Sequence, residues 1–224
     1  MARPGVSKPP RRTQEQRSNR MRARLLDATI DCLVEYGYAG TTAARVAERA
    51  GVTRGAQVHH FGSKTDLVTA AISHLAQRRT EAVIRELGRL RVGEDPLGAM
   101  LEGMWELHQD PLFIAAVELW VAGRTDPALA AEVRKVEPFV NNAVLLAVSR
   151  LVPDEMRRKD VRDFTYTAMD TLRGILVSNF VSADAERAHR RWRRASQQLR
   201  SAAGSTLSDI DITDRDGWAG EMDD

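Results

Sequence analysis

Residues 41–64 constrain the fold most, because they read as two short helices joined by a tight turn. The hydroxyl of Thr42 can accept a hydrogen bond from an otherwise unpaired backbone N–H, which caps the first helix. Gly51 ends that helix at a position that needs a left-handed backbone, and glycine adopts this conformation without steric cost. Thr53 then caps a second helix, which we expect to end near Phe61. This arrangement predicts a helix-turn-helix, whose second helix enters the major groove of DNA.

A family resemblance rests on this stretch, on the amphipathic helix before it and on the sequence FGSKTDL after it. The residues that carry it are Gly37, Thr41, Thr42, Val46, Ala47, Ala50, Gly51, Val52, Gly55, Phe61, Lys64 and Leu67. With them, residues 17–70 resemble the N-terminal DNA-binding domain of TetR-family transcriptional regulators. The resemblance implies an all-α protein with a three-helix helix-turn-helix domain and a C-terminal helical ligand-binding and dimerisation domain. It also implies a repressor that binds a palindromic operator as a dimer and is released by a small molecule.

Arg54 and Gln57 are the expected base readers of the second helix. Arginine can form two hydrogen bonds to O6 and N7 of guanine, and glutamine can do the same with N6 and N7 of adenine. The family pattern has an apolar residue and then tyrosine where this chain has Gln57 and Val58. The tyrosine that usually touches phosphate is therefore absent. Val58 either contacts a thymine methyl group or turns inward and leaves Gln57 facing the groove.

His59 and His60 do not suggest a metal site, because adjacent helix positions point about 100° apart and no third ligand follows at helical spacing. We expect them to donate to phosphates or base edges, or to form a partly buried helix face. Lys64 follows Ser63, the expected cap of the next helix, and by the resemblance it contacts a phosphate. The expected DNA-contacting residues are Thr41, Thr42, Thr53, Arg54, Gln57, Val58, His59, His60 and Lys64.

The charge distribution supports a polyanionic partner for the N-terminal part of the chain. Residues 1–64 contain twelve arginine and lysine residues and five carboxylates, a net charge of +7, whereas residues 204–224 contain one arginine and seven carboxylates, a net −6. A basic segment suits DNA, and an acidic one does not. Cys32 is the only cysteine, so no intrachain disulfide can form and a reducing cytoplasm fits. No apolar run approaches the roughly 20 residues that span a bilayer, so we expect no membrane partner.

The sequence predicts that the chain consists of four segments. Residues 1–14, with three prolines and scattered basic residues, are expected to be a disordered basic arm, either solvated or lying along DNA. Residues 15–70 are the DNA-binding domain, and residues 71–203 are the helical ligand-binding and dimerisation domain. Residues 204–224 are expected to be a disordered acidic tail.

The expected helices continue to the end of the second domain. The first spans about residues 15–36 and the fourth about 64–87. Asp-Pro pairs at 95–96, 110–111 and 126–127 start the fifth, sixth and seventh helices, because aspartate caps a helix and proline suits its first position. Pro138 should kink or split the seventh helix, since its ring clashes with the preceding turn. An eighth helix is expected over residues 160–181 and a ninth from residue 185.

The last two helices are the expected dimer interface. The eighth is apolar almost all round towards its end, and such a helix must be buried on several sides. The ninth has a narrow apolar seam that includes small residues, which permit close helix approach. Packing within one chain is the alternative. The expected interface residues are Leu172, Ile175, Phe180, Ala188, Trp192 and Leu199.

A ligand pocket is expected among the fifth to eighth helices, where methionines and aromatic side chains recur. Such residues usually fill a core, but Asn142 beside Pro138 offers a polar anchor on an apolar wall. Methionine side chains adapt their shape, which favours a bulky hydrophobic or aromatic effector. The expected pocket residues are Met100, Met104, Trp105, His108, Trp120, Phe139, Asn142, Phe164 and Met169.

Two other classes of function are weaker. A helical enzyme would need acid–base residues, for which Glu118, His108 and Asp170 are the available candidates. No nucleophile motif, phosphate loop or metal-spaced cluster supports this class, and no cofactor is expected. A DNA-binding protein without an effector is the other alternative, which a second domain without a cavity would favour.

Overall fold

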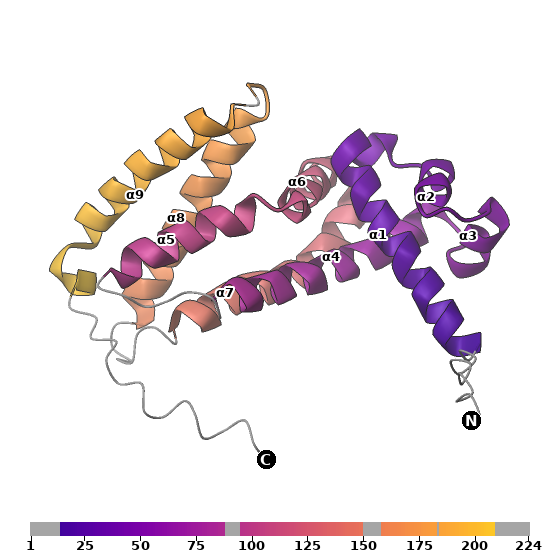
Figure 1. Ribbon diagram of the computed structural model, residues 1–224, viewed down its shortest axis with the longest axis horizontal. Coiled ribbons are helices and arrows are strands. Elements are labelled where there is room, and N and C mark those ends of the chain that lie inside the picture. The colour runs from indigo at the N-terminus through magenta and orange to yellow at the C-terminus, as the bar shows by residue number, and fades with distance from the viewer. Residues whose placement is uncertain (1–13, 88–94, 150–157, 183, 209–224) are drawn as a thin grey trace, which may run out of the picture. The chain divides into compact units, whose positions relative to one another are not determined.

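The computed structural model describes residues 14–87, 95–149, 158–182 and 184–208, and these residues form nine helices and no strand (Figure 1). The helices are α1 (Gln14–Gly40), α2 (Ala43–Arg49), α3 (Arg54–His60), α4 (Lys64–Leu87), α5 (Pro96–His108), α6 (Pro111–Gly123), α7 (Pro127–Ser149), α8 (Arg158–Asn179) and α9 (Ala185–Ser208). This part of the chain therefore has the all-α architecture that the sequence predicts.

The three Asp-Pro helix starts are confirmed. An aspartate oxygen accepts a hydrogen bond from a first-turn backbone N–H in each case: Gly98 at 2.9 Å for Asp95, Leu112 at 2.8 Å for Asp110, and Leu129 at 3.0 Å for Asp126. The prolines occupy the first helical position, where no N–H is needed. Local sequence alone thus sets where α5, α6 and α7 begin.

Three predicted boundaries differ from the structure. Pro138 does not split α7, which runs without a break over Pro127–Ser149. Its neighbours Val133, Val140 and Val144 are buried, and the packing of that face holds the helix together despite the hydrogen bond that proline removes. α8 begins and ends about two residues earlier than predicted. α9 continues to Ser208, so the predicted start of the tail at residue 204 is wrong.

Some predictions fall outside the described residues: the disordered arm lies there except for Gln14, which begins α1, and so does the acidic tail from residue 209. The described residues divide into two compact units between Ala71 and Ile72, within α4. The first unit contains α1 to α3 and the start of α4. Its core is formed by Leu25, Leu26, Ala28, Cys32, Val46, Ala50, Phe61, Leu67 and Ala71.

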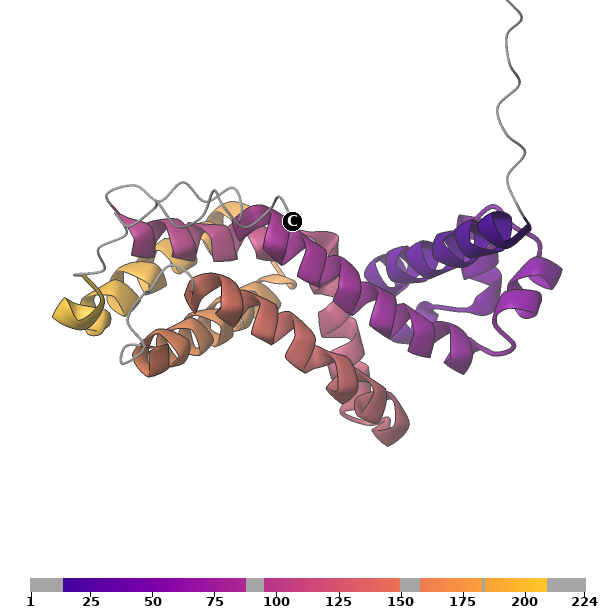
Figure 2. The same ribbon diagram turned by 90° about the horizontal axis from the view of Figure 1, so that it is seen from below.

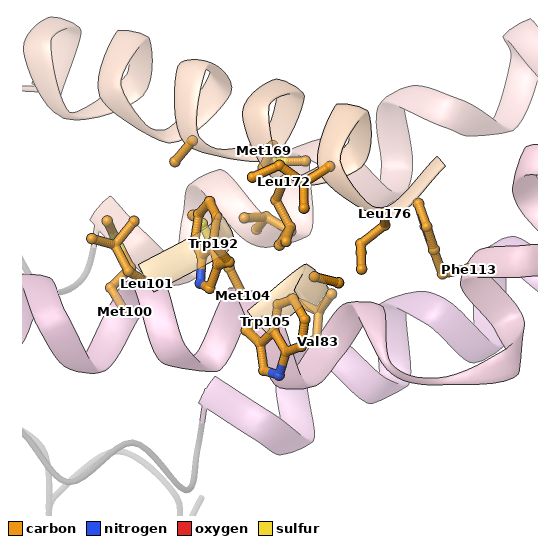
Figure 3. Close-up of a cluster of buried hydrophobic side chains, with 14 of the residues drawn as sticks. Val83, Met100, Leu101, Met104, Trp105, Phe113, Met169, Leu172, Leu176 and Trp192 are labelled. Atoms are coloured by element: carbon orange, nitrogen blue, oxygen red, sulfur yellow. The ribbon is translucent and has the colours of Figure 1, made fainter. Parts of the chain in front are cut away.

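The second unit is built on two sets of packed helices. α6 and α7 lie side by side (Figure 2), and α5, α8 and α9 pack on one another. Figure 3 shows Trp192 of α9 among the side chains of Met104 from α5 and Leu172 from α8. All three side chains are at most 3% exposed. The core of this unit therefore uses the apolar faces of both C-terminal helices.

Candidate nucleic-acid interface and ligand pocket

The turn between α2 and α3 has the predicted geometry. The Thr42 hydroxyl accepts a hydrogen bond from the N–H of Arg45 at 3.3 Å, and the Thr53 hydroxyl accepts one from the N–H of Ala56 at 3.2 Å. Gly51 has a φ of 61°, in the left-handed region that favours glycine. A threonine directly before each short helix therefore caps it, and a glycine forms the turn between them.

Arginines of the first unit brace this turn. The Arg24 guanidinium donates to the carbonyl of Ala50, at the end of α2, and Arg49 forms an ion pair with Glu35 of α1. These contacts attach α2 to α1 and satisfy a carbonyl that the helix end leaves without a partner. Part of the basic character of this segment thus supports the fold.

Gln57 and Val58 settle the alternative that the sequence leaves open. Gln57 is only 1% exposed, and its Nε2 donates to the carbonyl of Phe61 at 2.9 Å, whereas Val58 is 50% exposed. The prediction of Gln57 as a base reader is therefore wrong. Its aliphatic stem packs inside the unit, and its amide satisfies a carbonyl at the end of α3. Val58 is the side chain that faces outward.

The outward face of α3 consists of Arg54, Gly55, Val58 and His59, which are all exposed. Their spacing of one, four and five positions places them on one side of the helix. His60 is half-buried, and its ring centroid lies 5.3 Å from that of His59 in an edge-on arrangement. Among the described residues, no three His, Cys, Asp or Glu side chains are grouped to hold a metal ion. The face combines a cation, an apolar surface and an imidazole.

Thr41 has a structural role that the sequence prediction missed. It is 1% exposed, and its Oγ1 donates to the carbonyl of Gly37 at 2.8 Å. Gly37 has a φ of 67° and interrupts the helical backbone of α1 directly after Tyr36, where the sequence predicts the first helix to end. Thr41 therefore caps the end of α1, and its burial makes the predicted DNA contact of this side chain wrong. Thr42 and Thr53 are exposed and remain on the outer surface.

Lys64 lies at the start of α4, as predicted, and is half-buried. Its Nζ donates to the carbonyl of Tyr38 at 3.2 Å and lies 4.7 Å from the centre of the Tyr38 ring. The first turn of α4 is closed by a reciprocal pair: the N–H of Asp66 donates to Ser63 Oγ at 3.1 Å, and the N–H of Ser63 donates to Asp66 Oδ2 at 3.0 Å. The cation is thus held at a defined place on the surface of the first unit.

A mostly apolar cavity of ≈ 40 Å³ lies in the second unit between α4, α6 and α7. Its polar lining residues are Arg79, Glu137 and Asn141. The other lining residues are Ile72, Leu75, Ala76, Ala116, Leu119, Trp120, Val133, Val136 and Val140. The cavity has the composition of a small-molecule site, with an apolar wall and a few polar groups.

The structure does not gather the expected pocket residues around this cavity. Of the nine, only Trp120 lines it. Phe139 is 66% exposed and Asn142 is exposed, because on an unbroken α7 they share a face that points away from the buried valines. The remaining six are packed inside the unit or at the edge of its core: Met100, Met104, Trp105, His108, Phe164 and Met169. The predicted grouping is therefore wrong, and sequence reasoning missed Arg79 and Glu137.

His108 is buried at the end of α5. Its Nδ1 lies 2.8 Å from the carbonyl oxygen of Met104, and its Nε2 is buried without a hydrogen-bond partner in the described part of the chain. Burial lowers the pKa of His108 to about 3, and the nearby charges of Arg79 and Arg173 act in the same direction. The imidazole is therefore neutral at physiological pH. Asp170, another residue of the enzyme hypothesis, has a 76% exposed side chain.

Most of the expected dimer interface is buried within one chain. Leu172, Ile175, Ala188 and Trp192 are at most 8% exposed, and Leu199 packs against the same core. Their prediction as intersubunit residues is wrong, because α5 covers the apolar faces of α8 and α9. Phe180 remains 45% exposed.

The opposite face of α8 remains open. Gly174 has no atom within 4 Å of the position where a Cβ would lie, and Val177 is 41% exposed. Val181, in the turn that follows α8, is 96% exposed. Gly174 and Val177 are three positions apart and therefore lie on one side of α8. Within the described residues, no helix is both long and apolar enough to cross a membrane.

Comparisons with known proteins agree with this architecture. The profile of the family described as bacterial regulatory proteins, tetR family, matches residues 25–71. The chain is 34% identical over 185 residues to the HTH-type transcriptional regulator CymR of Pseudomonas putida, a match that covers 81% of this chain and 90% of that protein. It is 30% identical over 163 residues to the HTH-type transcriptional repressor AcnR of Corynebacterium glutamicum, covering 72% of this chain and 82% of that protein.

A solved structure shows the same fold. A transcriptional regulator from Rhodococcus sp. superposes with a TM-score of 0.61 at 21% identity, over 81% of this chain and 95% of that one. The helix-turn-helix profile and the long matches to curated regulators identify one family, and the shared fold is consistent with it. The chain belongs to the TetR family of bacterial regulatory proteins and is a DNA-binding transcriptional regulator.

Proposed function

We propose that this regulator is a repressor that binds a palindromic operator as a homodimer and is released by a small molecule bound in the second unit. The observation that carries the proposal is the outward face of α3, where Arg54, Val58 and His59 are exposed while Gln57 is fixed inside. A regulator of this kind acts on chromosomal DNA in the cytoplasm, in a complex without a membrane partner.

Each residue of the outward face has a distinct role in this proposal. Arg54 reads guanine through O6 and N7, and Val58 contacts the methyl group of thymine. His59 donates to a base edge or a phosphate. Lys64, Thr42 and Thr53 lie on the flanking surface and contact the phosphate backbone, which positions the helix without selecting sequence.

The dimer brings two copies of this face to two half-sites about one helical turn apart. We propose that the copies meet through the open face of α8, which includes Gly174 and Val177, and through Val181 in the turn that follows it. Small and apolar positions allow two helices to approach closely and exclude water. The buried face of α8 serves the core of one chain, which explains why this helix is apolar on more than one side.

The proposed effector occupies the cavity between α4, α6 and α7. α4 begins at Lys64 and also contributes Ile72, Leu75 and Arg79 to the cavity. A ligand that requires a different position of α4 thus acts on the helix that carries a DNA-contacting lysine. Such a ligand releases DNA only if it binds the released state more tightly than the DNA-bound state.

Selection from random double-stranded DNA with the full chain tests this function. We expect a two-fold symmetric site, with an affinity that falls steeply as salt rises. Arg54→Ala should cost about 1–3 kcal/mol and relax the preference at one position, and Lys64→Ala should weaken all sequences alike. Arg134→Ala, which removes the same charge from an exposed site on α7, is the control. Equal affinity of the wild type for the selected site and a scrambled one would exclude a specific regulator.

The dimer is tested separately with Gly174→Arg. The single chain should tolerate this change, because no atom lies within 4 Å of the added Cβ. A second copy would meet a bulky charge, so sedimentation should show a monomer that has lost operator affinity. Ala128→Arg, at an exposed position on α7, should stay dimeric. If Gly174→Arg is dimeric as well, the interface lies on another face.

A further inference from the structure

We propose that the cavity between α4, α6 and α7 selects a small organic monoanion, whose charged group binds Arg79 and whose apolar body lies against the surrounding aliphatic side chains. The inference rests on the effector site proposed above and names the chemical class of its ligand. It follows from the guanidinium groups at the cavity, whose hydrogen-bond donors are incompletely paired.

Arg79 is the one cation among the described residues that line the cavity. Its Cζ lies 6.0 Å from the centre of the Trp120 ring, and within the described residues its guanidinium forms no ion pair. Burial lowers the pKa of Arg79 to about 10, and the charge of Arg173 acts in the same direction. Arg79 therefore remains protonated at neutral pH, and its charge lies in the apolar wall at a cost in solvation.

A second guanidinium group, that of Arg173, also lies over the Trp120 ring. The Cζ of Arg173 lies 5.2 Å from the Trp120 ring centre, and its Nη2 donates to Asn141 Oδ1 at 3.3 Å. Its nearest carboxylate is the exposed Asp170, at 3.8 Å, and its Nε is buried without a partner in the described chain. Two guanidinium groups on one indole ring repel each other, so an anion beside them would relieve both the repulsion and the missing hydrogen bonds.

Glu137 is the one carboxylate among the residues that line the cavity. It partly offsets the charges of Arg79 and Arg173, but it does not form an ion pair with either in the part of the chain that the structure describes. Asp110 adds to this offset at Arg79, and Asp170 adds to it at Arg173. The two guanidinium groups share the Trp120 ring and leave donors without partners among the described residues, including Arg173 Nε. Only an acceptor can satisfy these donors, so they favour an anionic ligand.

The size of the cavity limits the ligand and links binding to movement. At ≈ 40 Å³ the cavity has room for only a few water molecules. An apolar cavity that holds one benzene ring has a volume of about 150 Å³. The cavity is partly open to solvent, so a ligand whose ring or alkyl chain is wholly enclosed there must separate the helices that line it, and α4 is one of them. This requirement makes the bound and empty states different in structure.

Matched probes that differ in one group test the proposal. They are ω-phenylalkanoates from phenylacetate to 6-phenylhexanoate, together with the alcohol and the amine of each chain length. Calorimetric titration of the full-length wild type at neutral pH should show, for at least one length, that the carboxylate binds about tenfold or more tightly than the alcohol. The amine should bind most weakly.

Variants connect this preference to the named residues. Arg79→Gln should remove the preference for carboxylate while leaving the alcohol within about threefold, and Glu137→Gln should strengthen carboxylate binding. Arg79→Lys keeps the charge and should keep part of the preference for carboxylate. This variant tests the role of Arg79 if Arg79→Gln is too unstable to measure. Arg85→Gln, at an exposed position of α4, is the control and should bind like the wild type.

Three outcomes would overturn the proposal. They are equal affinity for carboxylate and alcohol at every length, a preference that survives Arg79→Gln, and the absence of any binding below about 1 mM. Operator binding without ligand is measured on the same samples. If the wild type does not bind the operator, that result counts against the repressor function. The titrations alone would still decide whether the cavity prefers the carboxylate.

Discussion

The two units treat buried polar side chains differently. In the first unit, buried polar groups are satisfied by a nearby backbone carbonyl: Thr29 by Leu25, Thr41 by Gly37 and Gln57 by Phe61. In the second unit, four buried side-chain atoms have no hydrogen-bond partner among the described residues: His108 Nε2, Arg173 Nε, His189 Nε2 and Ser196 Oγ. All the unsatisfied atoms of this kind in the described chain thus belong to the second unit.

This difference fits the two proposed roles. A surface that reads bases must hold its side chains in one geometry, and local hydrogen bonds achieve this within a few residues. A unit that responds to a ligand needs two states of similar free energy, and unsatisfied buried groups raise the free energy of one of them. The first unit is therefore built for a single conformation, and the second retains groups that a ligand or a rearrangement can satisfy.

The largest expected effect is the destabilisation of the second unit by Trp192→Ala, which removes a large side chain from its core. The side chain is 1% exposed, and it packs within the cluster shown in Figure 3. We expect a loss of about 3–5 kcal/mol in the free energy of unfolding, measured by denaturant titration. If the variant has the same denaturant slope as the wild type, the loss reflects lower stability of the folded chain and not a change in the unfolded state. If the variant were as stable as the wild type but monomeric, Trp192 would be an intersubunit residue instead.

Acid should destabilise the second unit through His108. Its pKa is about 3 in the folded chain and 6.5 when exposed, so below pH 6.5 the unfolded chain binds a proton that the folded chain does not. The contribution of the neutral His108 imidazole to the free energy of unfolding is complete above pH 6.5. It falls by about 1.4 kcal/mol per pH unit between pH 6.5 and 3. Denaturant titrations of the wild type and His108→Leu over this range should show a shallower loss in the variant. Identical pH profiles would show that His108 is not the titrating group.

The smallest expected effects distinguish two adjacent residues of α3. Gln57→Ala leaves the Phe61 carbonyl without its partner and should cost about 1–3 kcal/mol of stability, with operator affinity reduced alike for all sequences. Val58→Ala, at an exposed position, should change stability by less than about 0.5 kcal/mol and alter the preference at one base pair. Thermal unfolding and competition binding measure both. The reverse pattern would mean that Gln57 faces the DNA.

The sequence was sufficient where structure depends on neighbouring residues. Thr42, Thr53 and Gly51 determine the helix-turn-helix, and the three Asp-Pro pairs determine the starts of α5, α6 and α7. Caps and left-handed glycines act within one turn of helix, so their effect is visible in a short stretch of sequence. This is why the family and the general fold could be predicted without coordinates.

Only the tertiary structure decided which side of a helix is buried. The inward turn of Gln57, the burial of Trp192 within one chain and the position of the cavity were not predictable from spacing, because a helix with apolar residues on several sides can pack in more than one way. One signal was present: Arg79 follows Leu75 by four residues and precedes Val83 by four, so a charge occupies a position in the apolar stripe of α4. Its meaning depends on Trp120, Glu137 and Arg173, which other helices supply and which only the folded chain brings together.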